Sequence, residues 1–242
     1  MIVLFTDFGV EGPYTGQMTA VLLQSAPAVP IVSLFADLPP GQPKPAAYLL
    51  AAYARWFADG TVFVCIVDPG VGSDRGALIV EADGRCYVGP DNGLFEIVLR
   101  RASRNRVWQI AWQPPALSAS FHGRDLFAPV AARLARGETP DSLGRETQAM
   151  PQLGWPDDLA EIVYIDRYGN GMTGLRGEIV APGARLSAGD REVARAETFS
   201  AVPQGTAFWY VNSNGLVEIA VNQGRADREL SLAVGAGIEI FS

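Results

Sequence analysis

The sequence has one histidine and two cysteines among its 242 residues. A single histidine excludes the multi-histidine zinc sites of common hydrolases, and two cysteines in separate apolar runs cannot complete one. A magnesium site made of carboxylates alone has no supporting pattern. We therefore expect no resident metal, and we expect Cys65 and Cys86 to be buried small hydrophobes of a protein in a reducing compartment.

Long apolar runs and clustered basic residues are also missing. No run approaches the roughly 18–20 apolar residues of a membrane span, and no basic segment precedes the apolar start of the chain, which excludes a signal peptide. The 19 Lys and Arg against 26 Asp and Glu give a net charge of −7. This acidic balance argues against a nucleic-acid partner, which requires clustered cations. We expect a soluble, cytoplasmic protein.

Apolar residues and turn residues, by contrast, are plentiful. Hydrophobic residues make up 48% of the chain, which excludes a disordered protein. The 26 glycines and 17 prolines predict many turns. The length suits one large domain or two modest ones.

The first half of the chain alternates between strand-like and helical patterns. Apolar runs at 2–5, 31–35 and 61–67 predict strands, and the helical spacing at 14–25 and 45–57 predicts the helices between them. A strand pair turning at Asp83-Gly84 follows, and 93–100 and 125–136 are further helix candidates. This order predicts an α/β N-terminal domain with a mostly parallel sheet over residues 1–150.

The residue composition changes between 137 and 158, where the chain is polar and rich in proline. Such a stretch is typical of an interdomain connection. We place a linker at 151–158. Beyond it, short strands are predicted at 161–165, 176–180, 206–211, 216–221 and 238–241, with no convincing helix. Residues 159–242 are therefore predicted to form a smaller, all-β, barrel-like C-terminal domain.

Polar residues follow the predicted parallel strands, at the sheet edge where ligands bind in such folds. Asp7, Asp68 and Asp91 each lie next to glycines, which allow close approach of a ligand. Asp7 and Asp91 are also ordinary turn residues. Asp68 is harder to explain structurally, because a charge directly after a buried strand needs a partner or a solvated cleft.

The lone histidine stands at the entrance of a predicted helix, in Phe-His-Gly-Arg-Asp at 121–125. A single histidine is often structural, but this setting favours a site residue. Asp125 is equally compatible with an N-cap of that helix. The glycine loop at 68–75 is not a phosphate cradle, because it lacks the P-loop pattern, carries two acids and precedes a strand. The pattern alone predicts a small-molecule site of unspecified chemistry.

Five segments occur together and in order: Thr6-Asp-Phe-Gly9, Val67-Asp-Pro-Gly-Val-Gly72 with Arg75, Gly89-Pro-Asp-Asn-Gly93, Phe121-His-Gly-Arg-Asp125 and Asn212-Ser-Asn-Gly215. In these segments the chain resembles the S-adenosylmethionine (SAM) hydroxide adenosyltransferases, which are SAM hydrolases related to the SAM-dependent fluorinases and chlorinases. The resemblance extends over nearly the whole length. It implies a homotrimer that binds SAM between the N-domain of one subunit and the C-domain of its neighbour, with no cofactor.

The activity implied by the resemblance is attack of water on the ribose C5′ carbon, which releases adenosine and L-methionine. The implied catalytic triad is Asp68, Arg75 and His122, where Arg75 stabilises hydroxide character and His122 takes or relays the proton. The implied substrate-binding residues are Asp7 at the ribose hydroxyls, Asp166 and Ser213 at the methionine, Asn170 at the adenine, and Val221 and Gln223 with backbone at the adenine edge. Tyr14 is a further implied substrate-binding residue.

Three departures from the halogenases bear on these expectations. Asp68 stands where the halogenases have an aromatic residue, which favours water over halide as the nucleophile. Asn214 stands where they have an arginine, and the segment 34–38 lacks the histidine expected after the second strand. Three alternatives remain open from the sequence: a SAM-binding sensor with negligible turnover, halide-dependent adenosyl transfer, and an unrelated carboxylate-metal hydrolase.

Overall fold

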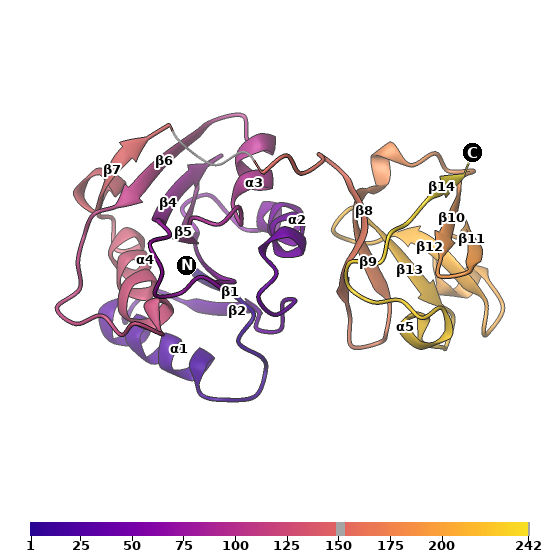
Figure 1. Cartoon of the computed structure of the whole chain (residues 1–242), viewed down its shortest axis with the longest axis horizontal. Coiled ribbons are helices and arrows are strands. Elements are labelled where there is room, and N and C mark those ends of the chain that lie inside the picture. Colours follow the sequence, from indigo (N-terminus) through magenta and orange to yellow (C-terminus); the bar gives the residue numbers. More distant parts are fainter. Residues whose placement is uncertain (149–152, 242) are drawn as a thin grey trace. The chain divides into compact units, whose positions relative to one another are not determined.

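The computed structural model describes residues 1–148 and 153–241. The chain divides into two compact units, Met1–Leu153 and Gly154–Ser242 (Figure 1). The predicted linker 151–158 begins with two residues, 151 and 152, that lie outside the described residues. Within the described part, no helix has both the length and the apolar character that crossing a membrane requires.

The first unit is built on a seven-stranded sheet of order β2-β1-β3-β5-β4-β6-β7 (Figure 1). Its strands are β1 (Ile2–Thr6), β2 (Ile31–Phe35), β3 (Val62–Ile66), β4 (Ala77–Ala82), β5 (Arg85–Pro90), β6 (Asn105–Ile110) and β7 (Gly144–Thr147). Strands β2, β1, β3 and β5 are parallel, whereas β4, β6 and β7 pair antiparallel. The sheet is thus mixed, and the expected mostly parallel sheet is confirmed only for the half that contains β1.

Two features turn the other half antiparallel. The predicted hairpin at Asp83-Gly84 is present, and it reverses the chain direction between β4 and β5. Strands β6 and β7 then extend the sheet along β4. Strand β7 lies in the polar stretch that was interpreted as an interdomain connection. Its side chains are mostly exposed at the sheet edge, so it lacks the apolar pattern by which strands are recognised.

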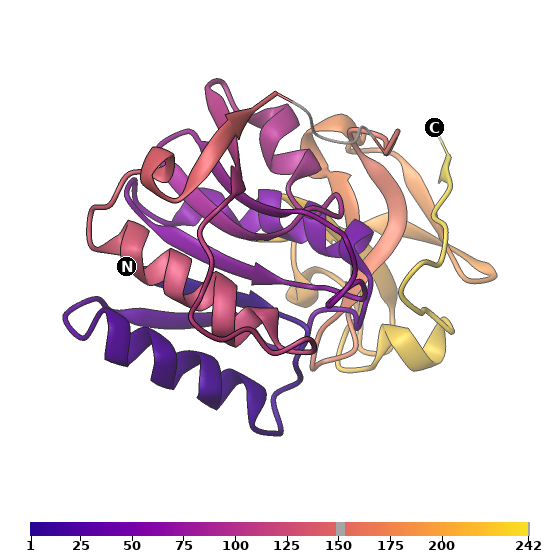
Figure 2. The same ribbon diagram turned by 60° about the vertical axis from the view of Figure 1, so that its left-hand side comes forward.

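Helices cover both faces of this sheet (Figure 2). The helices α1 (Tyr14–Ser25) and α4 (Ala128–Ala135) pack against each other on one face, while α2 (Pro43–Tyr53) and α3 (Glu96–Arg101) pack together on the other. Side chains along β1 alternate between the two faces of the sheet and pack against the helices on each face. Ile2 and Leu4 join the core beneath α1 and α4. Phe5 packs on the opposite side against Phe35, which contacts α2.

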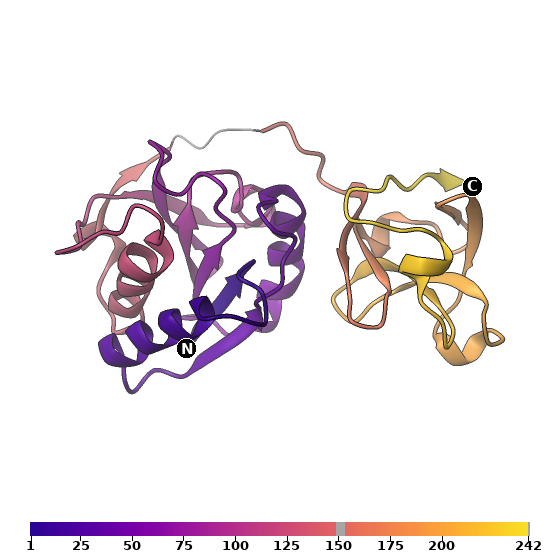
Figure 3. The ribbon, with the colours of Figure 1, turned by 60° about the horizontal axis from the view of Figure 1, so that its bottom comes forward.

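The second unit is a seven-stranded sheet of order β14-β10-β11-β12-β13-β9-β8 (Figure 1). Figure 3 shows the same unit from another side. Its strands are β8 (Leu159–Ile165), β9 (Gly171–Arg176), β10 (Arg185–Ala188), β11 (Arg191–Arg195), β12 (Ala207–Val211), β13 (Leu216–Val221) and β14 (Ile240–Phe241). Its one α-helix in the described residues is a single turn, α5 (Ala226–Glu229). The strand predicted at 176–180 was wrong, because a 3-10 turn, Gly177–Ile179, begins where β9 ends.

The two edges of this sheet are linked by the segment 235–241. The N–H groups of Gly235 and Ile238 donate to carbonyls of β8, and the N–H of Ile162 donates back to the Ala236 carbonyl. Beyond it, the Glu239 carbonyl accepts from β10, and β14 pairs with β10. One segment therefore satisfies backbone groups of both edge strands of an all-β unit.

Candidate functional site

The parallel strands β1 and β3 bring two carboxylates to one edge of the sheet. Asp7 follows β1, and its backbone N–H donates to the Ile66 carbonyl at the end of β3 over 3.2 Å. Asp68 follows β3 after one further residue. The register of the parallel pair therefore places the two acids side by side at the carboxyl ends of the strands, as the sequence predicted.

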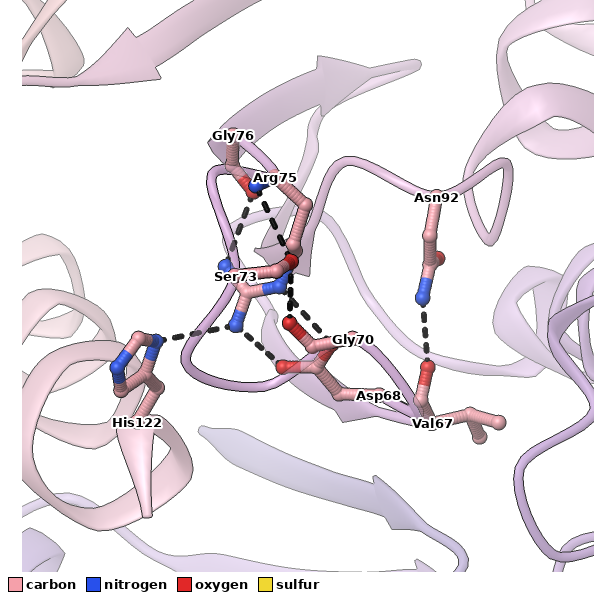
Figure 4. Close-up of polar contacts among 8 residues, drawn as sticks. All are labelled: Val67, Asp68, Gly70, Ser73, Arg75, Gly76, Asn92 and His122. Carbon is pink, nitrogen blue, oxygen red and sulfur yellow. Dashed lines mark hydrogen bonds and ion pairs between the residues drawn. The ribbon is translucent and has the colours of Figure 1, made fainter. Parts of the chain in front are cut away.

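Arg75 forms a bidentate ion pair with Asp68 (Figure 4). Its Nε donates to Oδ1 of Asp68 over 2.9 Å, and its Nη2 donates to Oδ2. Its Nη1 donates to the Gly76 carbonyl over 3.0 Å. The Arg75 and Asp68 side chains are only 11% and 5% exposed. Because both planar groups are held by several bonds away from water, the guanidinium is fixed in one orientation.

The same guanidinium contacts the histidine. Nη2 of Arg75 lies 3.2 Å from Nδ1 of His122 (Figure 4). The pKa of His122 lies below its ordinary value of 6.5, first because burial disfavours the charged imidazolium and second because Arg75 repels it. The residue is therefore neutral at pH 7.

A turn of π-helix, Gly123–Phe127, begins immediately after His122 and leads into α4. Pro129 has no N–H to donate to the carbonyl four residues earlier, so the ordinary α-helical bond is missing at this point. The Ala128 N–H instead donates to the Gly123 carbonyl, five residues back. Such π turns occur frequently at functional sites. His122 directly precedes this turn, so the turn determines the position of the histidine relative to α4.

Asp125 lies inside this π turn and is not an N-cap, contrary to the structural interpretation of the sequence. Its carboxylate accepts from the Arg124 side chain at 2.6 and 2.9 Å and from the Ser118 N–H at 2.9 Å. The ion pair with Arg124 lowers the pKa of Asp125. Asp125 thus closes the loop that precedes His122.

The loop that carries Arg75 packs directly on the loop before His122. Gly72 has a positive φ of 81°, and a Cβ added there would lie 2.5 Å from the Ala119 carbonyl oxygen. Within the loop, Ser73 Oγ donates to the Gly70 carbonyl over 2.6 Å. Glycine is required at position 72 for both the conformation and the close approach.

Asp7 is the second acid of the site. Its Oδ2 accepts from the Gly41 N–H over 2.8 Å. Burial raises the pKa of Asp7, and the negative charge of Asp68 adds to that effect, while the Gly41 bond opposes it. Gly41 lies just beyond the segment 34–38 that lacks the expected histidine, so the chain after β2 contributes a backbone donor to the site.

These groups surround a cavity of about 130 Å³. It is lined by Asp7, Phe8, Gly41, Ile66, Asp68, Pro69, Val71, Ser120, Phe121, His122 and Gly123. The predicted residue Tyr14 lies at its border, where its ring packs on Phe8 and Phe121 at centroid distances of 5.7 and 5.5 Å. The structure therefore brings together Asp7, Tyr14 and the three predicted catalytic residues in the first unit.

The segment 89–93 supports this cavity from the neighbouring strand β5. Asn92 Nδ2 donates to the Val67 carbonyl over 2.8 Å (Figure 4), and its Oδ1 accepts from the Leu94 N–H. Asn92 therefore holds the end of β3, directly before Asp68. Burial raises the pKa of Asp91 next to it.

The second unit has its own pocket of about 440 Å³. It is lined by Asp166, Tyr168, Asn170, Phe199, Tyr210, Val221, Gln223 and Gly224. Four of these, Asp166, Asn170, Val221 and Gln223, are predicted substrate-binding residues, and they come from separate segments. The predicted residue Ser213 does not line it, since it is exposed in the turn between β12 and β13.

Asp166 and Asn170 close the hairpin between β8 and β9. The backbone N–H of Asn170 donates to Oδ1 of Asp166 over 2.8 Å, and Asn170 Nδ2 donates to Oδ2 over 3.0 Å. Gln223 has a positive φ of 56°, which is uncommon for a residue other than glycine. Such backbone is found at ligand sites, where the surrounding structure maintains it.

Several aromatic residues of the two pockets were missed in the sequence, where tyrosines and tryptophans were mostly interpreted as core. Tyr168 is 76% exposed in a polar hairpin turn, and that position was the available signal. Phe199 and Tyr210 pack together at a centroid distance of 5.4 Å. No local pattern distinguishes these two from core residues.

Among residues 1–148 and 153–241, no group of three or more His, Cys, Asp or Glu side chains could hold a metal ion. Both cysteines are free thiols. Cys65 is fully buried, as expected, whereas Cys86 is only partly buried. Burial raises the pKa of Cys86 to about 11, so its thiol is protonated at neutral pH.

Comparison with known families gives matches over both units. Residues 2–144 match the model of the SAM hydroxide adenosyltransferase N-terminal domain, and residues 160–239 match that of the C-terminal domain. An (R)-S-adenosyl-L-methionine hydrolase of Thermus thermophilus is 39% identical, with 99% of each chain covered. A fluorinase of Nocardia brasiliensis is 22% identical over 99% of this chain and 96% of its own.

The fold has a counterpart among solved structures. An uncharacterised conserved protein of Thermotoga maritima superposes with a TM-score of 0.91 and 29% identity, and the match covers all of both chains.

Proposed function

The chain belongs to the SAM hydroxide adenosyltransferase family, and from this premise we propose that it hydrolyses SAM to adenosine and L-methionine. The observation that carries the proposal is the hydrogen-bonded Asp68–Arg75–His122 group, whose Asp68 and His122 line one cavity together with Asp7. The hydrolase relative is named for (R)-S-adenosyl-L-methionine. We propose the same sulfonium configuration for the substrate here.

The reaction is an in-line displacement at the ribose C5′ carbon. The water oxygen forms a bond to C5′, the C5′–S bond breaks, and its electron pair stays on sulfur as the neutral thioether of methionine. Because the leaving group departs neutral, it needs no general acid. The catalytic difficulty lies with the water, which is a weak nucleophile and must lose a proton.

Arg75 stabilises hydroxide character on the attacking oxygen through its charge, and His122 does so as a hydrogen-bond donor. The guanidinium has no acceptor atom, so Nδ1 of His122 is the acceptor of their bond and the ring proton resides on Nε2. His122 in this state has no free lone pair with which to take the proton. This geometry favours a donor role over the proton transfer that the resemblance suggested.

Asp68 accepts the proton lost by the water and passes it to solvent. Its two oxygens accept from Arg75, and each retains a further lone pair. The carboxylate also lines the cavity, whereas Arg75 holds it from outside. Asp68 therefore has two roles: it orients Arg75, and it accepts the proton of the water. Proton transfer of this kind is worth on the order of 10²–10⁴-fold in rate.

Substrate binding divides between the two units. Asp7 binds the vicinal ribose hydroxyls, for which a carboxylate with two acceptor oxygens is suited, and Tyr14 closes that side. The pocket of the second unit takes the adenine through Asn170 and the backbone of Val221 and Gln223. Asp166 and Ser213 contact the methionine. A homotrimer completes each site, with the N-domain of one subunit and the C-domain of its neighbour.

The protein works without a metal or cofactor, in the cytoplasm. The proposed step uses the charge of Arg75, the Nε2–H of His122 and the oxygens of Asp68. Asp68 also places negative charge where an incoming halide would approach, which favours water as the nucleophile.

The test is incubation of the purified protein with each sulfonium epimer of SAM, without added metal or halide, followed by chromatography. We expect adenosine and methionine in equal amounts from the (R) epimer, and none from His122→Ala protein. SAM binding by calorimetry without adenosine formation would replace the hydrolase with a sensor. Neither binding nor turnover would mean that the fold is kept for another substrate.

A further inference from the structure

The loop that joins β3 to β4 has to cross the end of a third strand. In the sheet order, β5 lies between β3 and β4. Strand β5 is parallel to β3, and Ala77, the first residue of β4, pairs with Pro90, the last residue of β5. The loop 67–76 therefore spans the carboxyl end of β5. It carries Asp68 near its beginning and Arg75 near its end.

The two residues that follow β5 hold both ends of this loop. The backbone N–H of Asp91 donates to the Gly76 carbonyl over 3.0 Å. Asn92 Nδ2 donates to the Val67 carbonyl over 2.8 Å (Figure 4). One bond is made at the first residue of the loop and the other at its last. The backbone after β5 thus fixes how far apart the two ends of the loop lie.

Each of the two anchored carbonyls is next to one member of the catalytic ion pair. The Val67 carbonyl belongs to the peptide group that leads into Asp68. The Gly76 carbonyl accepts a second bond, from Nη1 of Arg75 over 3.0 Å. The ion pair between Asp68 and Arg75 then closes a ring of contacts between the two ends of the loop. A shift of either end would therefore change the geometry of the ion pair.

The side chain of Asn92 uses both of its polar atoms in this arrangement. Its Oδ1 accepts from the Leu94 N–H over 3.3 Å, as in an ordinary asparagine turn. The bond from Nδ2 to Val67 is different, because it joins positions 25 residues apart in the chain. An aspartate of the same shape could still accept from Leu94, but it would present an acceptor to the Val67 carbonyl.

We propose that Asn92 is a positioning residue for the reaction, which holds the backbone at Asp68 so that this carboxylate stays paired with Arg75 and faces the cavity. The inference rests on the proposed function, in which this pair activates the water. Asn92 does not line the cavity, so its effect on the water passes through Asp68. The turn after β5 thereby has a function in the reaction besides joining a strand to a helix.

The experiment is a comparison of the Asn92→Ala substitution in wild-type and in Asp68→Ala protein, by steady-state kinetics. In the wild-type background we expect kcat to fall about tenfold or more, because a small misplacement of a reacting group is costly, and KM to change little. In the Asp68→Ala background the same substitution should lower kcat by less than about twofold, since two residues that act through one group are not additive. Equal losses in both backgrounds would overturn the proposal.

The matched control is Asn105→Ala. Asn105 Nδ2 also donates to a backbone carbonyl, that of Leu99 over 3.2 Å, but it does not line the cavity, so kcat should stay at the wild-type value. Asn92→Asp keeps the size of the side chain and loses the donor, and it replaces the alanine variant where that protein does not fold. An unchanged kcat in Asn92→Asp protein would contradict the inference.

A second readout does not depend on turnover. The Nε–H of Arg75 donates to Oδ1 of Asp68 over 2.9 Å, and its NMR signal is identified by its absence from Arg75→Ala protein. Its exchange with solvent should be at least about tenfold faster in Asn92→Ala protein than in wild type or in Asn105→Ala protein. Unchanged exchange overturns the inference whether or not SAM is hydrolysed. Faster exchange in a protein whose wild type yields no adenosine contradicts the proposed reaction alone.

Discussion

The Nη2 atom of Arg75 lies 3.2 Å from Nδ1 of His122, and the guanidinium can only donate in this contact. The contact requires a neutral imidazole. Protonation of Nδ1 would place a second donor, and a second positive charge, against Arg75. Arg75 therefore determines the protonation state of His122. When His122 is protonated at low pH, its contact with Arg75 should be lost.

The first prediction is an acid limb in the pH dependence of kcat/KM. The active form is neutral His122, and its pKa lies below 6.5. Activity should thus be complete at pH 7 and be lost as the pH falls through that lowered value. His122→Asn protein, which cannot titrate, should have lower activity and lose this limb. An identical limb in the variant would assign it to another group.

The second prediction concerns Arg75→Ala. We expect kcat to fall by about 10²–10³-fold, as for the loss of a preorganised electrostatic group that stabilises a developing oxyanion. KM should change little, because the contact matters in the transition state. Steady-state kinetics measures both. The control is Arg133→Ala, which also loses an arginine–carboxylate pair, with Glu138, but on α4 away from the cavity. An effect of Arg75→Ala on KM alone would contradict its role.

The third prediction tests the site between subunits. Asp7→Ala and Asp166→Ala proteins should each be impaired, but a mixture should regain activity after subunit exchange. Random assembly of a cyclic trimer would leave roughly a quarter of the sites intact. Native mass spectrometry measures the exchange, and the adenosine assay measures the recovery. Exchange without recovery would argue for a site within one chain.

The fourth prediction concerns Gly72→Ala. The added Cβ would lie 2.5 Å from the Ala119 carbonyl oxygen, at a φ of 81°. Strain and clash together should cost at least about 2 kcal/mol of the free energy of unfolding. Denaturant titration measures this loss. Gly12→Ala has a similarly positive φ of 106° without a neighbour within 4 Å, so it should lose less.

The fifth prediction concerns added ions. Chloride or fluoride should neither speed the release of methionine nor yield a halogenated nucleoside, because Asp68 disfavours an anion at the position of attack. Chromatography with and without the halides checks this. EDTA should leave the rate unchanged, since a neutral thioether needs no Lewis acid. A halogenated product would restore the halide-dependent alternative.

The proximity of Asp7, Asp68 and Arg75 could be predicted from the sequence, because it follows from the order of the strands and the loop between them. Asp7 and Asp68 follow apolar runs that become neighbouring parallel strands, so their proximity follows from the topology. Arg75 is close to Asp68 in the chain, and one glycine loop brings them together. The place of His122 beside Arg75 was predicted only from the family resemblance. No periodicity of the sequence relates the start of a helix to a loop across the cavity.

The rest could not be predicted, for physical reasons that differ between residues. Glu218 accepts hydrogen bonds from Tyr210 and Asn212, but it lies in an apolar strand pattern that gives no sign of these partners, since they belong to the neighbouring strand and the turn after it. Strand β7 has a polar sequence because it lies at the sheet edge. The π turn before α4 lies where Pro129 lacks an N–H, and its length could not be read from the hydrophobic pattern.

The segment 235–241, which pairs with β8 and then β10, also determines how this unit behaves toward other chains. An uncovered strand edge is a template on which a second molecule can add a strand, and long edges of this kind lead to aggregation. Here one segment occupies both edges. Loss of these few residues would remove Ile238 and Ala236 from the core of the unit and convert a self-contained sheet into one that can polymerise.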